Sequence, residues 1–298
     1  MKVGLIGVGN LGGAIAGVLV KNGFELVVCD IDATAQKKAS ALGAKLADSP
    51  AQVAGVTEIT LLALPFPSDV DTVVSDEKTG LLQGARPGSV IVDMSTVGPS
   101  TTRKNAAIAA KKSVEYLDAP VLGRPPSCGQ WTLPVGGKKE VLEKCRPVLS
   151  ALAKNVIHIG VLGSGNIIKL LNNMMFSVIN STTAEILALS TRLGVDPRVV
   201  YSTISESGAA TVSKLFLEVG SKMLKNDFTP VFSVDLMWKD LDVALQMARE
   251  VNAPMIVTRN AQILNEMARV KGLGKLDTSA VYSVVDGIFR DGSAESHK

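Results

Sequence analysis

Near the start of the chain, three glycines are spaced as in a phosphate-binding turn. Gly7-Val8-Gly9-Asn10-Leu11-Gly12 matches the pattern G-x-G-x-x-G. Glycines at these positions allow a tight turn, a close approach of the backbone to a pyrophosphate, and close packing of a helix on a strand. The helix that follows would offer its first N–H groups to the anion. We therefore predict that a dinucleotide cofactor binds to Gly7, Gly9, Asn10, Leu11 and Gly12.

A carboxylate follows this motif at a spacing suited to a ribose contact. Asp30 ends the second apolar run of the sequence. Its side chain could accept hydrogen bonds from the hydroxyl groups of an adenosine ribose, and it would repel a 2′-phosphate. Because Ile31 and Asp32 come next and no arginine does, the sequence favours NAD, with NADP as the alternative cofactor.

A lysine and an asparagine share a helix face in the middle of the chain. Lys169 and Asn173 are four residues apart in GSGNIIKLLNN, so their side chains would project together from a helix. Apolar neighbours and a bound nicotinamide cation would lower the pKa of the amine toward neutrality, where general acid–base catalysis is efficient. From the spacing alone, a lysine that lies along an amphipathic helix and reaches solvent is favoured over a catalytic one.

The elements that must position these residues in the first half alternate between strands and helices. Near-continuous apolar runs such as EITLLAL and GSVIVDM are typical of parallel strands that helices cover on both faces. The alternation predicts an α/β, Rossmann-type doubly wound sheet. The first helix is expected over Asn10–Lys21, and the predicted strands span residues 2–6, 25–29, 58–64, 89–92, 115–119, 132–135 and 156–159.

The strand signals stop after residue 162, and helical patterns replace them. Several of these patterns follow Asp-Pro, Thr-Pro or Ala-Pro steps, which suit the start of a helix. We predict two domains: residues 1–162 bind the dinucleotide, and residues 163–298 form an all-α domain for substrate binding and dimerisation, joined through one long helix. The predicted helices span residues 165–193, 197–206, 212–225, 233–250, 254–271 and 278–288.

Two further pairs of residues follow strands of the predicted sheet. Leu64 and Pro65 end one strand, and Ser95 and Thr96 follow another. Ligands of open α/β sheets lie at the carboxyl ends of the strands. We therefore expect Leu64 and Pro65 to wall the cofactor, and Ser95 and Thr96 to offer hydroxyl groups to the ligands. Ser95 could equally cap the helix that begins at Pro99.

The composition limits the classes of partner. The net charge of +3 on 298 residues is too small and too dispersed to predict nucleic-acid binding. The sequence contains no apolar run of 18 residues and begins directly on a strand, so we expect neither a membrane span nor a secretory signal. Three cysteines without a C-x-x-C pair indicate free thiols in a reducing compartment. We expect a cytoplasmic protein without a metal site.

Four segments in this order resemble the β-hydroxyacid dehydrogenases, the group that includes 3-hydroxyisobutyrate dehydrogenase. They are GLIGVGNLGGAIAGVLVKNG, DMSTVGPST, DAPVLG with the later TLPVGG, and GSGNIIKLLNN with the later KDLDVAL. The resemblance implies a Rossmann domain and a helical domain linked by a long helix, which agrees with the pattern of elements. It also implies a homodimer or homotetramer, and the Val- and Ala-rich long helix offers apolar surface for such an assembly.

The resemblance also implies roles for individual residues. Lys169 falls on the family's proton donor or acceptor, and Asn173 on the asparagine that accompanies it. Thr96 falls on a neighbour of the cofactor. Lys239 falls on a lysine close to substrate and cofactor, with Asp240 beside it.

One loop departs from the family pattern D-A-P-V-S-G-G. Leu122 replaces the substrate-binding serine, Arg124 replaces the second glycine, and the loop is two residues shorter. We expect Leu122 and Gly123 to remain beside the substrate. Arg124 could grip an acid group bidentately, or it could be a surface arginine braced by Pro125.

These inferences together predict an oxidoreductase that moves a hydride between a nicotinamide cofactor and a small 3-hydroxy acid or its semialdehyde. An NADPH-dependent semialdehyde reductase would use the same residues in the reverse direction and is the first alternative. An imine reductase would share the fold, although that group usually lacks a lysine at position 169. A non-catalytic dinucleotide-binding scaffold is the alternative from another class, and the presence of Lys169 with Asn173 counts against it.

Overall fold

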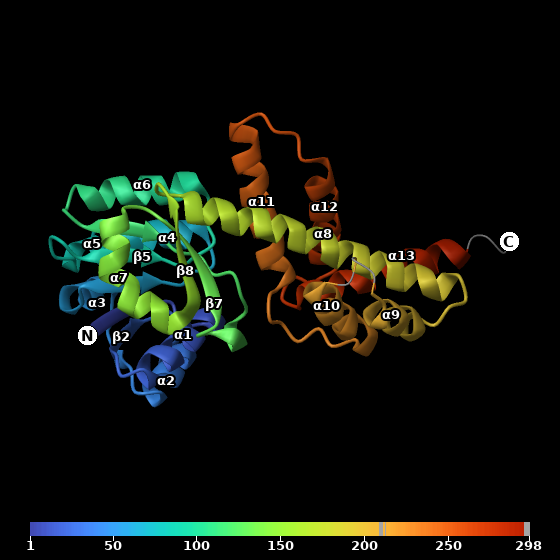
Figure 1. Ribbon diagram of the computed structural model, residues 1–298, viewed down its shortest axis with the longest axis horizontal. Helices are drawn as coiled ribbons and strands as arrows, with labels where there is room; N and C mark the ends of the chain where they lie inside the picture. The colour runs from blue at the N-terminus through green and yellow to red at the C-terminus, as the bar shows by residue number, and fades with distance from the viewer. Residues whose placement is uncertain (209–210, 212, 295–298) are drawn as a thin grey trace. The chain divides into compact units, whose positions relative to one another are not determined.

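A computed structural model describes residues 1–208, 211 and 213–294 of the chain. The chain divides into two compact units, Met1–Leu170 and Leu171–Lys298 (Figure 1). The boundary of 162 predicted from the sequence lies just before helix α8 (Ser164–Arg192), which begins in the first unit and continues into the second.

The first unit is built on one eight-stranded sheet. Its strand order is β3-β2-β1-β4-β5-β6-β7-β8, and each neighbouring pair is parallel except β6–β7. The order reverses beside β1, where ligands bind in open sheets of this kind. The prediction of a doubly wound α/β sheet is confirmed. The strands are β1 (Lys2–Ile6), β2 (Glu25–Cys29), β3 (Lys45–Leu46), β4 (Ile59–Leu62), β5 (Val90–Asp93), β6 (Glu115–Asp118), β7 (Trp131–Gly136) and β8 (Ala153–Gly160).

Each face of the sheet has its own apolar core. Helices α1 (Asn10–Lys21), α2 (Ala33–Ala41) and α7 (Lys139–Leu152) contribute to the core that contains Leu5 and Val92. Helices α3 (Pro50–Val56), α4 (Pro67–Ser75), α5 (Leu81–Gly84) and α6 (Pro99–Ala110) contribute to the core that contains Ile6 and Ile91. Successive residues of a strand thus enter opposite cores, which explains why the central strands are apolar throughout.

Two features of the sheet differ from the sequence-based prediction. Strand β3 was missed, because it has two residues, both exposed, and therefore no apolar pattern. Strand β7 runs antiparallel to β6, with Asp118 opposite Gly136. The segment between these strands holds the short 3-10 helix η1 (Pro125–Ser127) in place of a crossover helix, and parallel neighbours need a long crossover whereas antiparallel ones do not.

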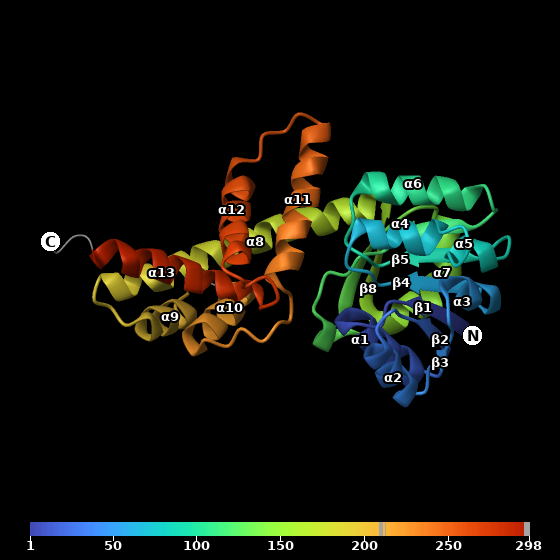
Figure 2. The same ribbon diagram turned by 180° about the vertical axis from the view of Figure 1, so that it is seen from behind.

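The second unit is helical in its described residues. After α8 come α9 (Pro197–Glu206), α10 (Lys214–Lys225), α11 (Val234–Glu250), α12 (Ile256–Val270), the 3-10 helix η2 (Thr278–Ala280) and α13 (Val281–Ala294). Figure 2 shows α11 and α12 side by side. The core of the unit joins Leu187 of α8, Val219 of α10, Ala268 of α12 and Val284 of α13. In the described part of the chain, no helix combines the length and the apolar character that a membrane crossing needs.

Some helix bounds in the second unit differ from the predicted ones. Helix α11 begins one residue after the predicted Ser233, which is its N-cap and accepts a hydrogen bond from the Leu236 amide, and the Thr-Pro step before it lies outside the helix. Helix α12 begins two residues after the predicted Pro254. The segment expected as one helix over 278–288 divides into η2 and a longer α13. The Asp-Pro step does open α9, where Asp196 accepts from the Arg198 amide at 2.8 Å.

Candidate functional site

The glycine-rich turn joins β1 to α1. Gly7 has a φ of +87°, a left-handed backbone conformation that residues other than glycine rarely adopt. A Cβ atom on Gly12 would lie 1.9 Å from the Gly7 carbonyl oxygen, so the helix can approach the strand only with glycine there. A Cβ atom on Gly9 would meet no heavy atom within 4 Å. The turn is therefore tight on its inner side and open at Gly9, beside the first N–H groups of α1.

Asp30 lies against this turn at the end of β2. Its carboxylate accepts hydrogen bonds from the Val8 amide at 2.6 Å and the Asp32 amide at 2.8 Å. Each carboxylate oxygen can still accept a further hydrogen bond, because each has two lone pairs. Free amides at a helix start, open space at Gly9 and a fixed carboxylate fit an adenine dinucleotide.

Ser95 connects the carboxyl ends of β4 and β5. Its side-chain oxygen accepts a hydrogen bond from the Leu64 amide at 3.0 Å, and its own amide donates to Asp93 at 2.9 Å. Ser95 is 2% exposed, whereas Pro65 is exposed and Thr96 is half-buried. The alternative role of Ser95 as a cap of α6 is wrong, because Gly98 occupies the N-cap position and no side chain caps that helix.

Two carboxylates that sequence reasoning did not single out end the neighbouring strands β5 and β6. Asp93 and Asp118 lie opposite each other in the sheet and are both 0% exposed. Burial raises the pKa of Asp93 to about 6, although hydrogen bonds from Ser95 and Tyr116 favour its charged form. Burial also raises the pKa of Asp118. An aspartate at the end of each apolar run, in VIVDMS and EYLDAP, was the available signal.

Asp118 binds the start of α8. One carboxylate oxygen accepts from the Gly163 amide at 2.8 Å and the other from the Asn166 amide at 2.9 Å. The side-chain amide of Asn166 is buried and lies 3.1 Å from the Thr102 hydroxyl. Lys169 follows Asn166 by three residues and is half-buried. The first turn of α8 is therefore fixed to the carboxyl end of β6 and to α6, and Lys169 lies about one turn further along.

In the second unit, the structure brings three of the predicted residues together. The Asn173 side chain on α8 donates a hydrogen bond to Asp240 on α11. The Lys239 amine lies 2.5 Å from the other Asp240 oxygen. All three side chains are buried, with 7% exposure for Lys239 and less for the others. Charged side chains are seldom buried unless they are paired, and here a carboxylate pairs with both an amine and an amide.

The loop after β6, which differs from the family pattern at Leu122 and Arg124, is held by Trp131. This tryptophan was not singled out in the sequence analysis. Its indole N–H donates to the Arg124 carbonyl at 2.7 Å, and its ring is 1% exposed. Gly123 packs so closely that a Cβ atom would lie 2.2 Å from the ring. Leu122 and Thr132 exchange two backbone hydrogen bonds, of 3.0 and 3.2 Å. The backbone of Leu122, Gly123 and Arg124 is therefore well fixed, and the tryptophan in GQWTLPVGG was the signal.

The thiols do not favour nucleophilic chemistry. All three cysteines are free, as predicted. Burial raises the pKa of Cys128 to about 11 and that of Cys145 to about 12, so both are thiols at neutral pH. Across the residues that the structure describes, His, Cys, Asp and Glu nowhere gather in a group of three that could hold a metal ion.

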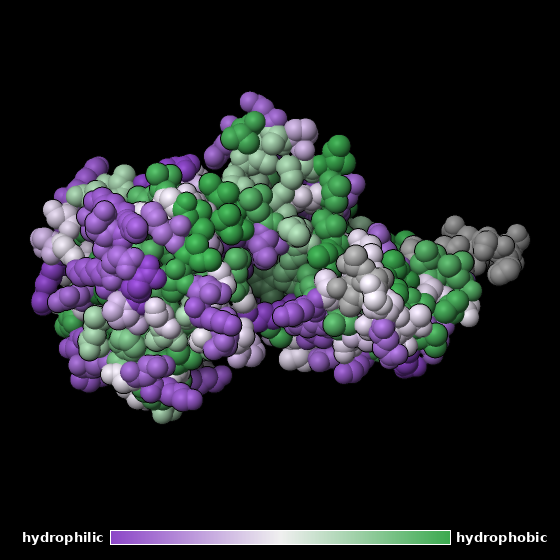
Figure 3. Space-filling view, viewed as in Figure 1, coloured by the Kyte–Doolittle hydropathy of each residue, from purple (hydrophilic) through white to green (hydrophobic). Residues whose placement is uncertain are grey.

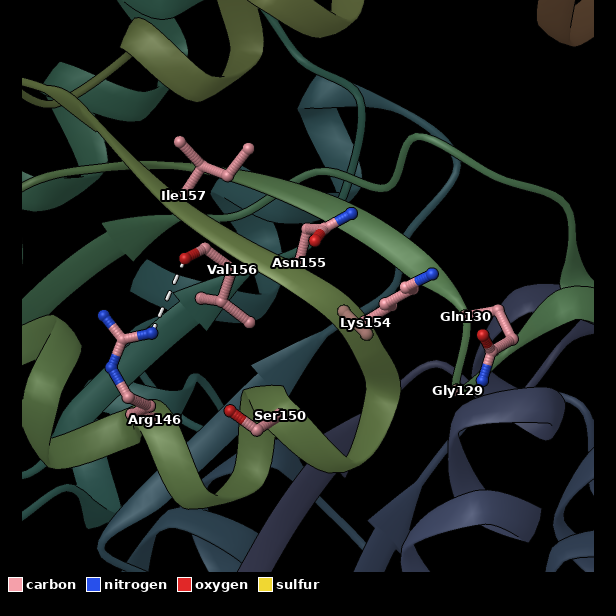
Figure 4. A pocket seen from close by; sticks show the side chains of 9 residues that line it. Gly129, Gln130, Arg146, Ser150, Lys154, Asn155, Val156 and Ile157 are labelled. Atoms are coloured by element: carbon pink, nitrogen blue, oxygen red, sulfur yellow. Dashed lines mark hydrogen bonds between the residues drawn. The ribbon is translucent and has the colours of Figure 1, made fainter.

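A separate surface pocket lies along β8 and α7. Figure 4 shows its lining, which includes Arg146, Ser150, Lys154 and Asn155 and which encloses about 550 Å³. The Arg146 guanidinium is paired with Glu143 at 2.6 Å. None of the predicted site residues lines this pocket, so it is not part of the candidate site.

Comparisons with known proteins agree with this geometry. The NAD-binding domain of 6-phosphogluconate dehydrogenase matches residues 2–160, and the NAD-binding domain of NADP-dependent 3-hydroxyisobutyrate dehydrogenase matches residues 163–285. The 2-(hydroxymethyl)glutarate dehydrogenase of Eubacterium barkeri is 34% identical over 95% of this chain and 94% of its own. The 3-sulfolactaldehyde reductase of Escherichia coli is 32% identical over 95% of each chain.

A solved structure supports the same assignment over almost the whole chain. The 3-hydroxyisobutyrate dehydrogenase from Salmonella typhimurium superposes with a TM-score of 0.87 at 28% identity, covering 95% of this chain and 99% of that one. Fold, matched domains and relatives therefore agree with the resemblance found in the sequence. The chain belongs to the β-hydroxyacid dehydrogenase family and is an NAD(P)-dependent oxidoreductase of the hydroxy-acid class.

Proposed function

We propose that the protein is an NAD-preferring dehydrogenase that interconverts a small 3-hydroxy acid, of the 3-hydroxyisobutyrate type, and its semialdehyde. One observation carries the proposal: the helix that bears Lys169 is bonded through its first turn to Asp118 at the end of β6 and to Thr102 on α6, at the edge of the sheet where the glycine-rich turn also lies. Family membership supplies the reaction class, and this geometry supports Lys169 as the group that would move the proton.

The proposed cofactor contacts lie around the glycine-rich turn. Gly7, Gly9, Asn10, Leu11 and Gly12 would hold the pyrophosphate, and Asp30 would bind the adenosine ribose. Leu64, Pro65 and Thr96 would line the cofactor further along the sheet edge, and Lys239 would lie near it. The preference for NAD follows from the Asp30 carboxylate, which repels a 2′-phosphate. When bound, the nicotinamide supplies the hydride chemistry.

The proton is moved by Lys169 in this proposal. The neutral amine takes the hydroxyl proton of the alcohol as the carbon is oxidised, and the ammonium returns it when the aldehyde is reduced. Asn173 lies one turn further along α8 and would hold the reacting oxygen with its amide. Asp240 pairs with Lys239 and accepts from Asn173, so it orients both side chains.

The acid group of the substrate would be held by the loop that follows β6. Ser95, Leu122 and Gly123 would lie beside the substrate, and Arg124 would bind its anionic group bidentately. Two relatives are named for substrates that carry carboxylate or sulfonate groups, 2-(hydroxymethyl)glutarate and 3-sulfolactaldehyde. An anionic substrate is therefore the common chemistry, and an arginine at position 124 suits it.

An NADPH-dependent semialdehyde reductase remains the second candidate. It would use the same residues with the ammonium form of Lys169 as proton donor. The Escherichia coli relative, which is named as a reductase, favours this direction. A non-catalytic scaffold is disfavoured because Lys169 and the buried group of Asn173, Lys239 and Asp240 are all present.

A substrate and cofactor panel tests the proposal. Purified protein is mixed with NAD or NADP and a set of 3-hydroxy acids, and with NADH or NADPH and small semialdehydes, while the absorbance of the reduced nicotinamide is followed. The proposal predicts turnover of at least one 3-hydroxy acid and its semialdehyde, with a higher kcat/KM for NAD than for NADP. A higher kcat/KM for NADPH with aldehydes would support the second candidate. No turnover across the panel would contradict both.

We also propose that the protein assembles as a homodimer or homotetramer in the cytoplasm, without a nucleic-acid or membrane partner. Apolar side chains remain exposed in the helical unit, among them Val251, Ile256, Val257 and Val270 at 61 to 89%, and Figure 3 shows apolar surface there. Exposed apolar patches of this kind mark interaction surfaces. Light scattering coupled to size exclusion should give a mass of two or four chains, and a monomer would contradict the proposal.

A further inference from the structure

The start of α8 lacks the local cap that helices usually have. Helices leave four N–H groups unsatisfied at their N-terminus, and a side chain at the N-cap commonly accepts from one of them. Here the residue before the helix is Gly163, with a φ of +91°, which has no side chain. The acceptor comes instead from Asp118, which is 45 residues earlier in the chain than Gly163.

Two glycines make room for this contact. A Cβ atom on Gly136 would lie 2.4 Å from an Asp118 carboxylate oxygen. A Cβ atom on Gly165 would lie 2.3 Å from the Pro134 carbonyl oxygen and 3.0 Å from the other Asp118 oxygen. Side chains at these positions would push α8 away from β6 and β7. The close approach of the helix to the strands is therefore built into the sequence at several positions.

The same turn of α8 has a second attachment. The buried side-chain amide of Asn166 lies 3.1 Å from the Thr102 hydroxyl on α6 and 3.3 Å from the backbone of Val97, just after β5. The carboxylate of Asp118 thus holds the backbone of this turn, and the side chain of Asn166 links the same turn to Thr102 and Val97. Asp118 and Asn166 together determine the position of the backbone from which the Lys169 side chain extends.

We propose that Asp118 is a positioning residue for Lys169, which it places by holding the first turn of α8 to the end of β6. This inference rests on the proposed function, in which Lys169 moves the proton. A positioned group loses much of its effect when it moves by about 1 Å, since such a shift can lower the rate about 100-fold. Asp118 itself touches neither substrate nor cofactor in this proposal.

The test replaces Asp118 with asparagine. Asparagine has the same shape, but its NH2 group would face one of the two α8 amides that the Asp118 carboxylate accepts from. The Asp118→Asn protein should show a kcat lowered by about 10- to 100-fold, an unchanged dissociation constant for NADH, and faster hydrogen exchange at residues 163–167. Lys169→Ala is measured beside it. If Lys169→Ala is inactive while Asp118→Asn turns over like wild type, this inference alone is wrong. If Lys169→Ala remains fully active, the proposed function fails and the inference fails with it.

A matched control separates positioning from loss of stability. Asp277 is also a buried aspartate, 1% exposed, that accepts backbone N–H bonds, from Val231 and Ser279 in the second unit. Asp277→Asn should lower the Tm without lowering kcat. If both aspartate variants lower kcat equally, the inference is overturned. Should Asp118→Asn not fold, Asn166→Ala removes the second attachment, and it should lower kcat several-fold with normal cofactor binding; a wild-type kcat would overturn the inference.

Discussion

The glycine-rich turn allows cofactor binding to be separated from folding, because its glycines have different surroundings. Gly12→Ala places a methyl group 1.9 Å from the Gly7 carbonyl oxygen, whereas ordinary contact begins near 3.4 Å. Gly9→Ala places one where no heavy atom lies within 4 Å. Gly17→Ala, further along α1, places one 3.9 Å from Leu42 and is the matched control.

The size of each effect follows from these distances. Gly12→Ala must separate α1 from β1 by about 1.5 Å, and overpacking of this kind costs about 1–3 kcal/mol of unfolding free energy. The displaced amides would lose one or more charge-assisted hydrogen bonds to the pyrophosphate, at about 1.5–3 kcal/mol each, so NADH should bind about 10- to 150-fold more weakly. Gly9→Ala should change the unfolding free energy by less than about 1 kcal/mol, yet weaken NADH binding at least about tenfold, because the methyl group occupies the approach of the pyrophosphate.

The assay combines fluorescence titration of NADH with urea unfolding of the protein without cofactor. Gly17→Ala should bind NADH like wild type and gain about 0.5–1 kcal/mol of unfolding free energy, since alanine suits a helix interior better than glycine. Wild-type affinity of Gly9→Ala for NADH would mean that the open space at Gly9 is not the pyrophosphate site.

Three further predictions follow from the other site residues. Arg124→Ala should raise the KM for the acid substrate at least about tenfold with little change in kcat; an unchanged KM for every active acid would exclude the anion contact. Asp30→Asn should raise the ratio of kcat/KM for NADP to that for NAD by at least about tenfold, and an unchanged ratio would contradict the ribose assignment. Asp93 has a pKa raised to about 6, so its contribution to stability is present below about pH 4 and is lost as the pH rises through 6. In urea unfolding, the unfolding free energy of wild type should fall by about 3 kcal/mol relative to that of Asp93→Asn between about pH 4 and pH 7. If the unfolding free energies of the two proteins changed in parallel with pH, the raised pKa of Asp93 would be contradicted.

Much of the fold could be predicted because its local signals agree with one another. Helices α1 and α9 have the predicted bounds, because α1 begins directly after the glycine-rich turn and α9 begins at the Asp-Pro step, where Asp196 caps it. Both starts can be recognised from local sequence. The central strands were recognised because both of their faces are buried, which makes them apolar throughout. By contrast, β3 is exposed and short, and the direction of β7 depends on how the chain returns after β6.

The candidate site was predictable where its residues form a sequence motif. Gly7, Gly12 and Asp30 are spaced by the geometry of one strand–helix–strand unit, so the pattern itself carries the information. The residue types of Trp131 and Asp118 stand out in GQWTLPVGG and EYLDAP, but the sequence does not say that they bind Arg124 and Gly163. Asp118 and Gly163 are 45 residues apart in the chain, and their contact exists only after the strands have been assembled.

Turnover by a Lys169→Arg protein shows whether Lys169 transfers the proton. Arginine keeps the positive charge and the length of the side chain but cannot give up its proton. We expect Lys169→Arg and Lys169→Ala both to lose at least about 100-fold in kcat, while the dissociation constant for NADH stays within about threefold of wild type. Wild-type turnover in the Lys169→Arg protein would show that Lys169 does not transfer the proton.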